Sequence, residues 1–214
     1  MIFIENADVY GFKPAVRGMR NPLNSWYKSD SSFEYYEESI GEADKELMEK
    51  LARGGSVHAK YRRMIIVTLD ITAPLYWWKE FDTYKVGTVA NSCSTMHTIH
   101  KRDLTLDDFS CERLFGDERY VLGEVIRCIN ANRVMFADEK DVEWKKKYWY
   151  QMIQLLPSSF NQKRTVLLNY EVLSAMYRDR RSHKLDEWRT FCNWIEKLPY
   201  ASGIIFENKK GDSK

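Results

Sequence analysis

The sequence predicts a single α/β domain, and three observations support this fold class. The chain has 214 residues, a length typical of one domain. Hydrophobic residues make up 44% of it, including ten Phe, thirteen Tyr and seven Trp, which is enough material for a core. Strand patterns lie in the first half of the chain and helical patterns in the second. Because no repeat or linker interrupts them, we expect one domain over residues 1–207 and a disordered tail at 208–214.

The first half is expected to combine strands, irregular segments and two helices. Residues 2–12 indicate an opening strand, whereas residues 13–40 are expected to be irregular because Pro and Gly recur there. Residues 41–53 predict a helix with acidic residues first and basic residues last, an order that complements the helix dipole. Alternation over residues 64–71 predicts a strand, and Pro74 then suits the first turn of a short aromatic helix.

The second half is expected to be helical. Apolar residues recur there at spacings of three and four, the pattern of a helix with one buried face. Four such stripes occupy residues 121–129, 144–156, 168–177 and 185–198. Residues 203–206 then favour a short closing strand.

Charge and cysteine usage limit the classes of protein. The chain has 33 basic and 31 acidic residues, for a net charge of +2, and this balance gives no electrostatic footprint for nucleic acid. It contains no apolar stretch near the ~20 residues that cross a bilayer, and no basic, apolar leader opens it. The cysteines form no Cys-x-x-Cys pair. We therefore expect a cytoplasmic protein with reduced thiols, no membrane or nucleic-acid partner and no metal site.

The polar stretch over residues 74–98 is the candidate ligand-binding segment. It is rich in hydroxyl, amide and cationic side chains and has no apolar period. Loops of this composition often bind ligands, but they are equally often simply solvated. The Walker, dinucleotide-binding, nucleophile-elbow and His-Glu-x-x-His motifs are all absent. Composition therefore leaves binding and solvation equally open.

The order of residues across this stretch carries a family resemblance. His58 precedes the predicted strand and Ala73-Pro74 follows it. After the aromatic helix come Glu80-Phe81, Thr83-Tyr84-Lys85, Thr88, Asn91, Ser92 and Ser94. This order resembles the signature region of the flavin-dependent thymidylate synthases. Members of that family have a His, a strand, Ala-Pro, an aromatic helix, Arg-His-Arg, and then Ser and Asn residues.

A second block carries the same resemblance without a gap. Asn169 follows Pro157 by twelve residues, and Arg180 follows Asn169 by eleven, which are the family's intervals. His183 lies one residue short of the place where some members have a flavin-contacting His. Together the two blocks span about half of the chain in the correct order, so each supports the other as structural context.

The resemblance implies both a fold and an activity. Family members have an α/β (α+β) fold with a central, mostly antiparallel sheet flanked by helices. They are homotetramers that use FAD to transfer a one-carbon unit reductively to C5 of dUMP, and the cofactor supplies the hydride. Folate is the one-carbon donor, and reduced nicotinamide is a further candidate partner. The chain would then be a methyltransferase of nucleotide biosynthesis.

Site residues follow from the same alignment of motifs. Arg180 is the expected catalytic residue, since a planar cation can stabilise an enolate-like uracil. The expected cofactor-binding residues are His58, Tyr84, Lys85, Asn169 and His183. The expected substrate-binding residues are Glu80, Asn91, Ser92, Ser94 and Arg180.

The chain also departs from the family pattern. Two of the three residues in the Arg-His-Arg place are neutral, and Glu171 stands where the family has a further Arg. Losing one buried cation from a phosphate contact costs about 2–5 kcal/mol. Unchanged dUMP binding would therefore need other cations, such as Arg62, Arg63 or Lys79, near the nucleotide.

Three classes of function therefore remain. The first is a flavin-dependent thymidylate synthase-like enzyme. The second is a family member with lost or altered catalysis that binds a nucleotide or modifies a different pyrimidine nucleotide. The third is an unrelated partner-binding protein with Tyr35, Tyr36, Trp77 and Trp78 at its interface, although large aromatic residues are more often buried.

Overall fold

A computed structural model describes residues 1–34 and 37–206. The predicted tail at 208–214, together with Tyr35 and Tyr36, lies outside the described residues. The chain forms two compact units. The first unit contains residues 1–4, 71–83 and 91–165, and the second contains the rest of the chain. The prediction of one domain over residues 1–207 stays a prediction, because compact units of one chain can belong to one domain.

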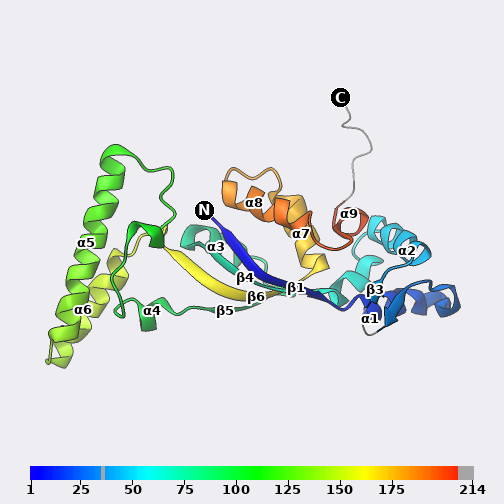
Figure 1. The fold of residues 1–214 in the computed structure, drawn as a ribbon, viewed down its shortest axis with the longest axis horizontal. Helices are drawn as coiled ribbons and strands as arrows, with labels where there is room; N and C mark the ends of the chain where they lie inside the picture. The colour runs from blue at the N-terminus through cyan, green and yellow to red at the C-terminus, as the bar shows by residue number, and fades with distance from the viewer. Residues whose placement is uncertain (35–36, 207–214) are drawn as a thin grey trace. The chain divides into compact units, whose positions relative to one another are not determined.

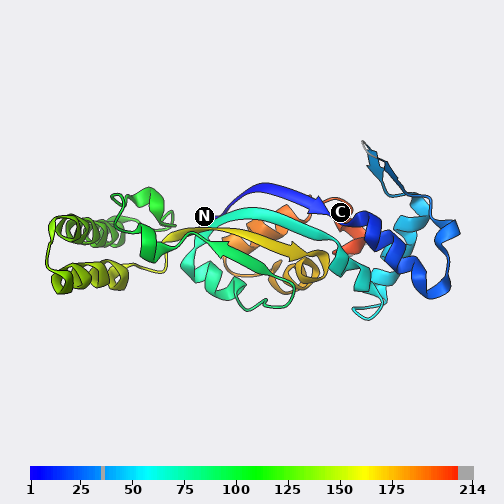
Figure 2. The same cartoon turned by 90° about the horizontal axis from the view of Figure 1, so that it is seen from below.

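The central sheet is four-stranded and antiparallel, with helices flanking it, as the sequence resemblance implied. Its strands lie in the order β1 (Phe3–Tyr10), β4 (Ile66–Pro74), β6 (Asn161–Asn169) and β5 (Val89–Ser92) (Figure 2). Alternate residues are buried from Ile65, directly before β4, to Ile71 within it, which confirms the alternation predicted there. A separate hairpin pairs β2 (Ser32–Glu34) with β3 (Glu37–Ser39).

The first unit is built on two long helices and a short aromatic one. Its helices are α3 (Leu75–Phe81), α4 (Thr95–Thr98), the 3-10 turn η4 (Leu106–Asp108), α5 (Gly116–Asp138) and α6 (Val142–Leu155). In both views α5 and α6 lie side by side (Figures 1 and 2). Ile129 and Met152 are fully buried in the core between these helices and the preceding loop. Trp77 and Trp78 are also buried, so they form no exposed interface.

The second unit carries the remaining helices. These are α1 (Phe12–Arg20), η1 (Asn21–Leu23), η2 (Trp26–Lys28), α2 (Glu42–Arg53), η3 (Ala59–Met64), α7 (Tyr170–Arg180), α8 (Asp186–Ile195) and α9 (Ala201–Ile204). The ring of Phe12 meets those of Tyr170 and Tyr200 edge to face, at 5.9 and 5.3 Å between ring centres. Through these contacts α1 packs against the start of α7 and against the segment before α9.

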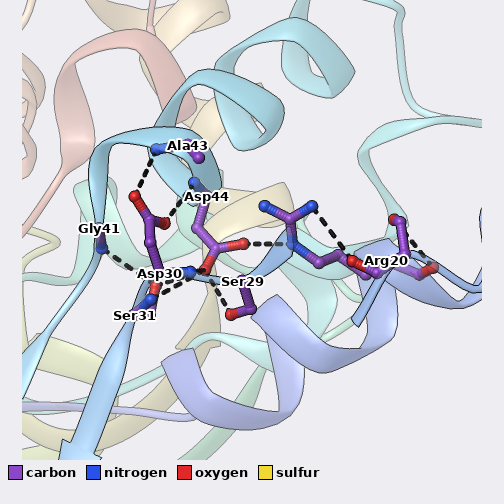
Figure 3. A network of polar contacts seen from close by, with 8 residues as sticks. Arg20, Ser29, Asp30, Ser31, Gly41, Ala43 and Asp44 are labelled. Atoms are coloured by element: carbon purple, nitrogen blue, oxygen red, sulfur yellow. Dashed lines mark hydrogen bonds and ion pairs between the residues drawn. The ribbon is translucent and has the colours of Figure 1, made fainter. Parts of the chain in front are cut away.

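A buried carboxylate joins α1 to α2 (Figure 3). Asp44 in the first turn of α2 is fully buried and accepts a hydrogen bond from Arg20 Nε at 2.5 Å. The hydroxyls of Ser29 and Ser31 donate to the same carboxylate at 2.6 and 2.7 Å. Asp30 caps the helix by accepting from the backbone amides of residues 43 and 44. The network therefore satisfies both the buried charge and the start of α2.

Several predictions about the elements were wrong. Residues 13–40 are not irregular throughout, because Phe12–Arg20 form α1, where Pro14 lies in the tolerated first turn. Leu168 belongs to β6 rather than to the following helix. Residues 203–206 form no strand. Gly203 and Ile204 end the short, kinked α9, in which Gly203 has φ +80°, and Phe206 makes only an isolated β-bridge with Ser202. Among the described residues, none of the helices is both long and apolar enough to span a membrane.

Candidate functional site

Arg180, at the end of α7, is the centre of a polar and aromatic cluster in the second unit. Its Nε donates a hydrogen bond to the hydroxyl of Tyr84 at 3.0 Å. Its guanidinium carbon lies 4.9 Å from the ring centre of Trp188 and 5.6 Å from that of Tyr84. Cations over such aromatic faces are attracted by the ring quadrupole. The cluster therefore holds the guanidinium in one place.

The segment that carries Tyr84 is tied to the start of α7. Thr88 donates its hydroxyl to the backbone carbonyl of Tyr84 at 2.6 Å. Gly87 has φ +79°, and a Cβ there would lie 2.5 Å from Asn169 Nδ2. The Oδ1 of Asn169 accepts from the backbone amide of Val172 at 2.9 Å and so caps α7. Glycine is therefore required for this close approach.

The predicted cofactor residues are only partly brought together. Tyr84, Asn169 and His183 lie in or beside this cluster, and the His183 ring centre is 6.4 Å from that of Trp188. Lys85 follows Tyr84 and is exposed to solvent. His58 lies elsewhere in the second unit, exposed beside a cavity of about 1010 Å³ lined by α1, α2 and η3. His58 is therefore not part of the Arg180 cluster within this unit.

The predicted substrate residues other than Arg180 all lie in the first unit. Asn91 and Ser92 are exposed on β5, and Ser94 directly precedes α4. Glu80 is half-buried on α3. The backbone between β5 and α4 is fixed to β6, because Cys93 donates its amide to the carbonyl of Lys163 at 2.9 Å. A cavity of about 340 Å³ adjoins this point, lined by Thr95, Thr98, Gln162 and Lys163 among others.

Arg164 on β6 is a cation of the first unit that sequence reasoning missed. Only 15% of its side chain is exposed, and it pairs with Asp82 at 2.8 Å. Its guanidinium carbon lies 4.2 Å from the ring centre of Trp78. Recognition of β6 as a strand would have placed Arg164 on the same face as Gln162, its hydrogen-bond partner. Trp188 was missed for a different reason, since it was counted only as a member of an apolar stripe.

The carboxylate of Glu171 is not isolated, because it is paired with an arginine. Its Oε2 lies 3.6 Å from a terminal nitrogen of Arg62 on η3. Arg62 was one of three cations expected to compensate for lost arginines. The structure places it against α7, where its charge is paired with that of Glu171.

The arrangement first defines a structural class. It is an α+β protein in which one antiparallel sheet and its flanking helices carry a cationic and aromatic cluster at the end of a helix. No protein-family model matches the chain, and no curated protein matches it either. Comparison with solved structures narrows the class further.

Two structures of thymidylate synthase X from Helicobacter pylori, solved with FAD and dUMP, share this fold. Both superpose with a TM-score of 0.68 at 16% sequence identity. The alignments cover 97% and 95% of this chain and 98% and 97% of those proteins. The fold is thus that of the flavin-dependent thymidylate synthases, which confirms the sequence resemblance at the level of the fold.

Proposed function

We propose that the chain is a divergent flavin-dependent thymidylate synthase-like protein that binds a pyrimidine nucleotide, dUMP, together with FAD. The observation that carries this proposal is the Arg180 cluster within a thymidylate synthase X fold. Arg180 is held between Tyr84 and Trp188 at the end of α7. The guanidinium is therefore positioned before a nucleotide arrives.

In the proposed reaction the chain positions the nucleotide and stabilises charge. C5 of the uracil becomes nucleophilic only as negative charge spreads onto the adjoining carbonyl oxygen. A positioned cation is most favourable where such charge develops, and the planar guanidinium of Arg180 can donate two parallel hydrogen bonds. Tyr84 keeps the cation in place by accepting a hydrogen bond from Nε of Arg180. The assignment of Asn91, Ser92 and Ser94 in the first unit as phosphate ligands rests on the sequence resemblance alone and stays a prediction.

The residues present fit a flavin in part. The approach of Gly87 to Asn169 leaves no room for a side chain, so the segment after Tyr84 lies directly against the start of α7. Asn169 and His183 would hold the ring edge, and the exposed Lys85 would meet a phosphate as a point charge. Bound FAD would supply the hydride for reduction of the one-carbon unit. A folate donor, reduced nicotinamide, a homotetrameric state and a cytoplasmic location complete the proposal.

A second candidate is a nucleotide-binding protein of the same fold without synthase activity. The specific observation in its favour is the environment of the cations. Arg180 already donates a hydrogen bond to Tyr84, and Arg62 is paired with Glu171. Fewer cations are therefore free to bind phosphates than the family pattern has. Binding of dUMP without dUMP-dependent oxidation of reduced flavin would select this candidate.

The experiment combines cofactor colour with nucleotide calorimetry. A purified protein that takes up FAD should absorb at about 450 nm, as oxidised flavin does, and should bind dUMP. Arg180→Gln should weaken dUMP binding by about 2–5 kcal/mol, because one charged partner is removed. Arg127→Gln is the matched control, since Arg127 is exposed on α5. A colourless protein, or unchanged dUMP affinity in Arg180→Gln, would contradict the proposal.

A further inference from the structure

A line of polar contacts in the first unit runs from the end of α3, across β6, to the turn between β5 and α4. At one end Arg164 on β6 pairs with Asp82, which directly follows α3, at 2.8 Å. Nε of Arg164 donates a hydrogen bond to Oε1 of Gln162 at 2.9 Å. At the other end, Nε2 of Gln162 donates to the backbone carbonyl of Cys93 at 3.0 Å. The line therefore joins α3 to the turn through two side chains of β6.

The side-chain amide of Gln162 is held in one orientation. Arginine has donors only, so Oε1 of Gln162 must face Arg164 and Nε2 must face the turn. The backbone of Gln162 is fixed as well, because its carbonyl accepts from Nε1 of the buried Trp78 at 2.9 Å. The guanidinium of Arg164 also lies over the ring of Trp78. Both Arg164 and Gln162 are thus anchored on the same aromatic residue.

The turn at Cys93 is held from two sides. Its carbonyl accepts from the side chain of Gln162, and its amide donates to the backbone carbonyl of Lys163 at 2.9 Å. Ser92 and Ser94, two of the predicted phosphate ligands, are the residues on either side of it. The amide of Gln162 therefore constrains the backbone that carries both serines.

Gln162 and Arg164 differ in how they meet the space beside this turn. Gln162 lines the cavity of about 340 Å³ together with Cys93 and Thr95. Arg164 is not among the described residues that line it. Arg164 can therefore influence the cavity only through Gln162, whereas Gln162 influences it through the backbone of the turn.

We propose that Arg164 and Gln162 are positioning residues, which hold the turn at Cys93 in the conformation that receives a nucleotide phosphate. This role rests on the proposed function and adds to it two residues outside the motifs of the sequence resemblance. Without the amide donor, the turn samples further conformations. The apparent affinity for a ligand falls in proportion to the fraction of the protein in the competent conformation.

Calorimetry with dUMP and with deoxyuridine tests this role. Gln162→Met keeps the length of the side chain but cannot donate to Cys93, and it should weaken dUMP binding about tenfold if the turn is competent about a tenth of the time. Arg164→Met should also weaken it, because the amide of Gln162 loses its fixed orientation. Arg164→Lys keeps a donor for Gln162 and should restore most of the affinity. Deoxyuridine lacks the phosphate, so its affinity should not change in any of the variants.

Hydrogen exchange of the unliganded protein tests the turn directly. The backbone amides of residues 93–98 should exchange faster in Gln162→Met, because local opening of the turn becomes easier. The amides of α5 and α6 should exchange as in the unaltered protein. Gln151→Met is the matched control, since Gln151 is exposed on α6 and the substitution is the same.

Three outcomes would overturn the positioning role. They are equal dUMP affinity in the unaltered protein and both methionine variants, an equal loss of affinity for deoxyuridine, and unchanged exchange of residues 93–98 in Gln162→Met. A protein that binds neither FAD nor dUMP would instead contradict the proposed function, and with it the part of the turn in nucleotide binding. Because exchange is measured without a ligand, the two failures are distinguishable.

Discussion

Replacement of Asp44 by alanine should be among the most destabilising single changes in the second unit. The carboxylate is fully buried and accepts from Arg20, from two serine hydroxyls and from the backbone amides of residues 30 and 31. Arg20 is itself only 5% exposed in its side chain. The substitution therefore leaves a buried guanidinium without its counter-charge and two helices without their link.

The expected loss is about 3–5 kcal/mol of unfolding free energy, the cost of removing one partner of a buried ion pair. The pair itself contributes less, since much of this loss is the cost of leaving Arg20 buried and unpaired. Replacement of both residues in Arg20→Leu/Asp44→Leu should therefore cost less than Asp44→Ala alone. By comparison, Glu42→Gln removes an exposed pair with Lys45 at 3.8 Å and should cost below about 1 kcal/mol.

Urea unfolding followed by circular dichroism measures these differences, and its pH dependence adds a second test. Burial acts to raise the pKa of Asp44, but hydrogen bonds from Ser29, Ser31 and Arg20 outweigh it, so the pKa is lowered. A lowered pKa gives stability that is present above the unfolded value, about 3.9, and is lost as the pH falls through the folded value. The stability difference between the unaltered protein and Asp44→Asn should thus shrink below about pH 4.

Two results would refute this reasoning. A loss below about 1 kcal/mol for Asp44→Ala would mean that the network is no better than a surface pair. A double variant that is less stable than Asp44→Ala would mean that Arg20 stabilises the fold without its partner. Equal urea dependence of all variants would confirm that the differences lie in the folded state.

Two further substitutions test the cluster and the thiols. Gly87→Ala should cost about 1–3 kcal/mol, because its positive φ and the contact with Asn169 both oppose a side chain. Gly55→Ala is the control, since φ there is +84° but nothing lies within 4 Å, so it should cost less in thermal unfolding. Burial raises the pKa of the Cys192 thiol to about 12, so an aromatic disulfide reagent should label the exposed Cys93 first. Loss of the fastest labelling phase in Cys93→Ser would verify this, and its persistence would refute it.

The fold could be predicted where pattern and local chemistry agreed. The alternation of β4, the acid-to-base order of α2 and the apolar stripe of α8 all correspond to elements of the structure. Prediction failed where a local rule was applied too strictly. Pro14 and Gly18 suggested an irregular segment, although Phe12, Ala15, Val16 and Met19 are buried at helical spacing.

The strands β5 and β6 were missed for a different physical reason. All four residues of β5 are exposed, so no apolar alternation marks it, and pairing within the sheet alone defines the strand. In β6 only Val166 and Leu168 are buried. The candidate site shows the same division. Asn169 and Arg180 were predicted from the family resemblance, which includes their spacing from Pro157, and their roles stay predictions. The contact of Arg180 with Trp188 depends on how α7 and α8 pack.

The distribution of cations explains how the fold can persist while its site chemistry changes. By the sequence resemblance, Tyr84 and Glu171 are predicted to stand where the family has basic residues, and the hydroxyl of Tyr84 holds Arg180. Arg62 approaches Glu171 from η3. In each case the neutral or acidic residue contacts an arginine and is not left without a polar partner. The substitution should therefore cost the folded state little free energy.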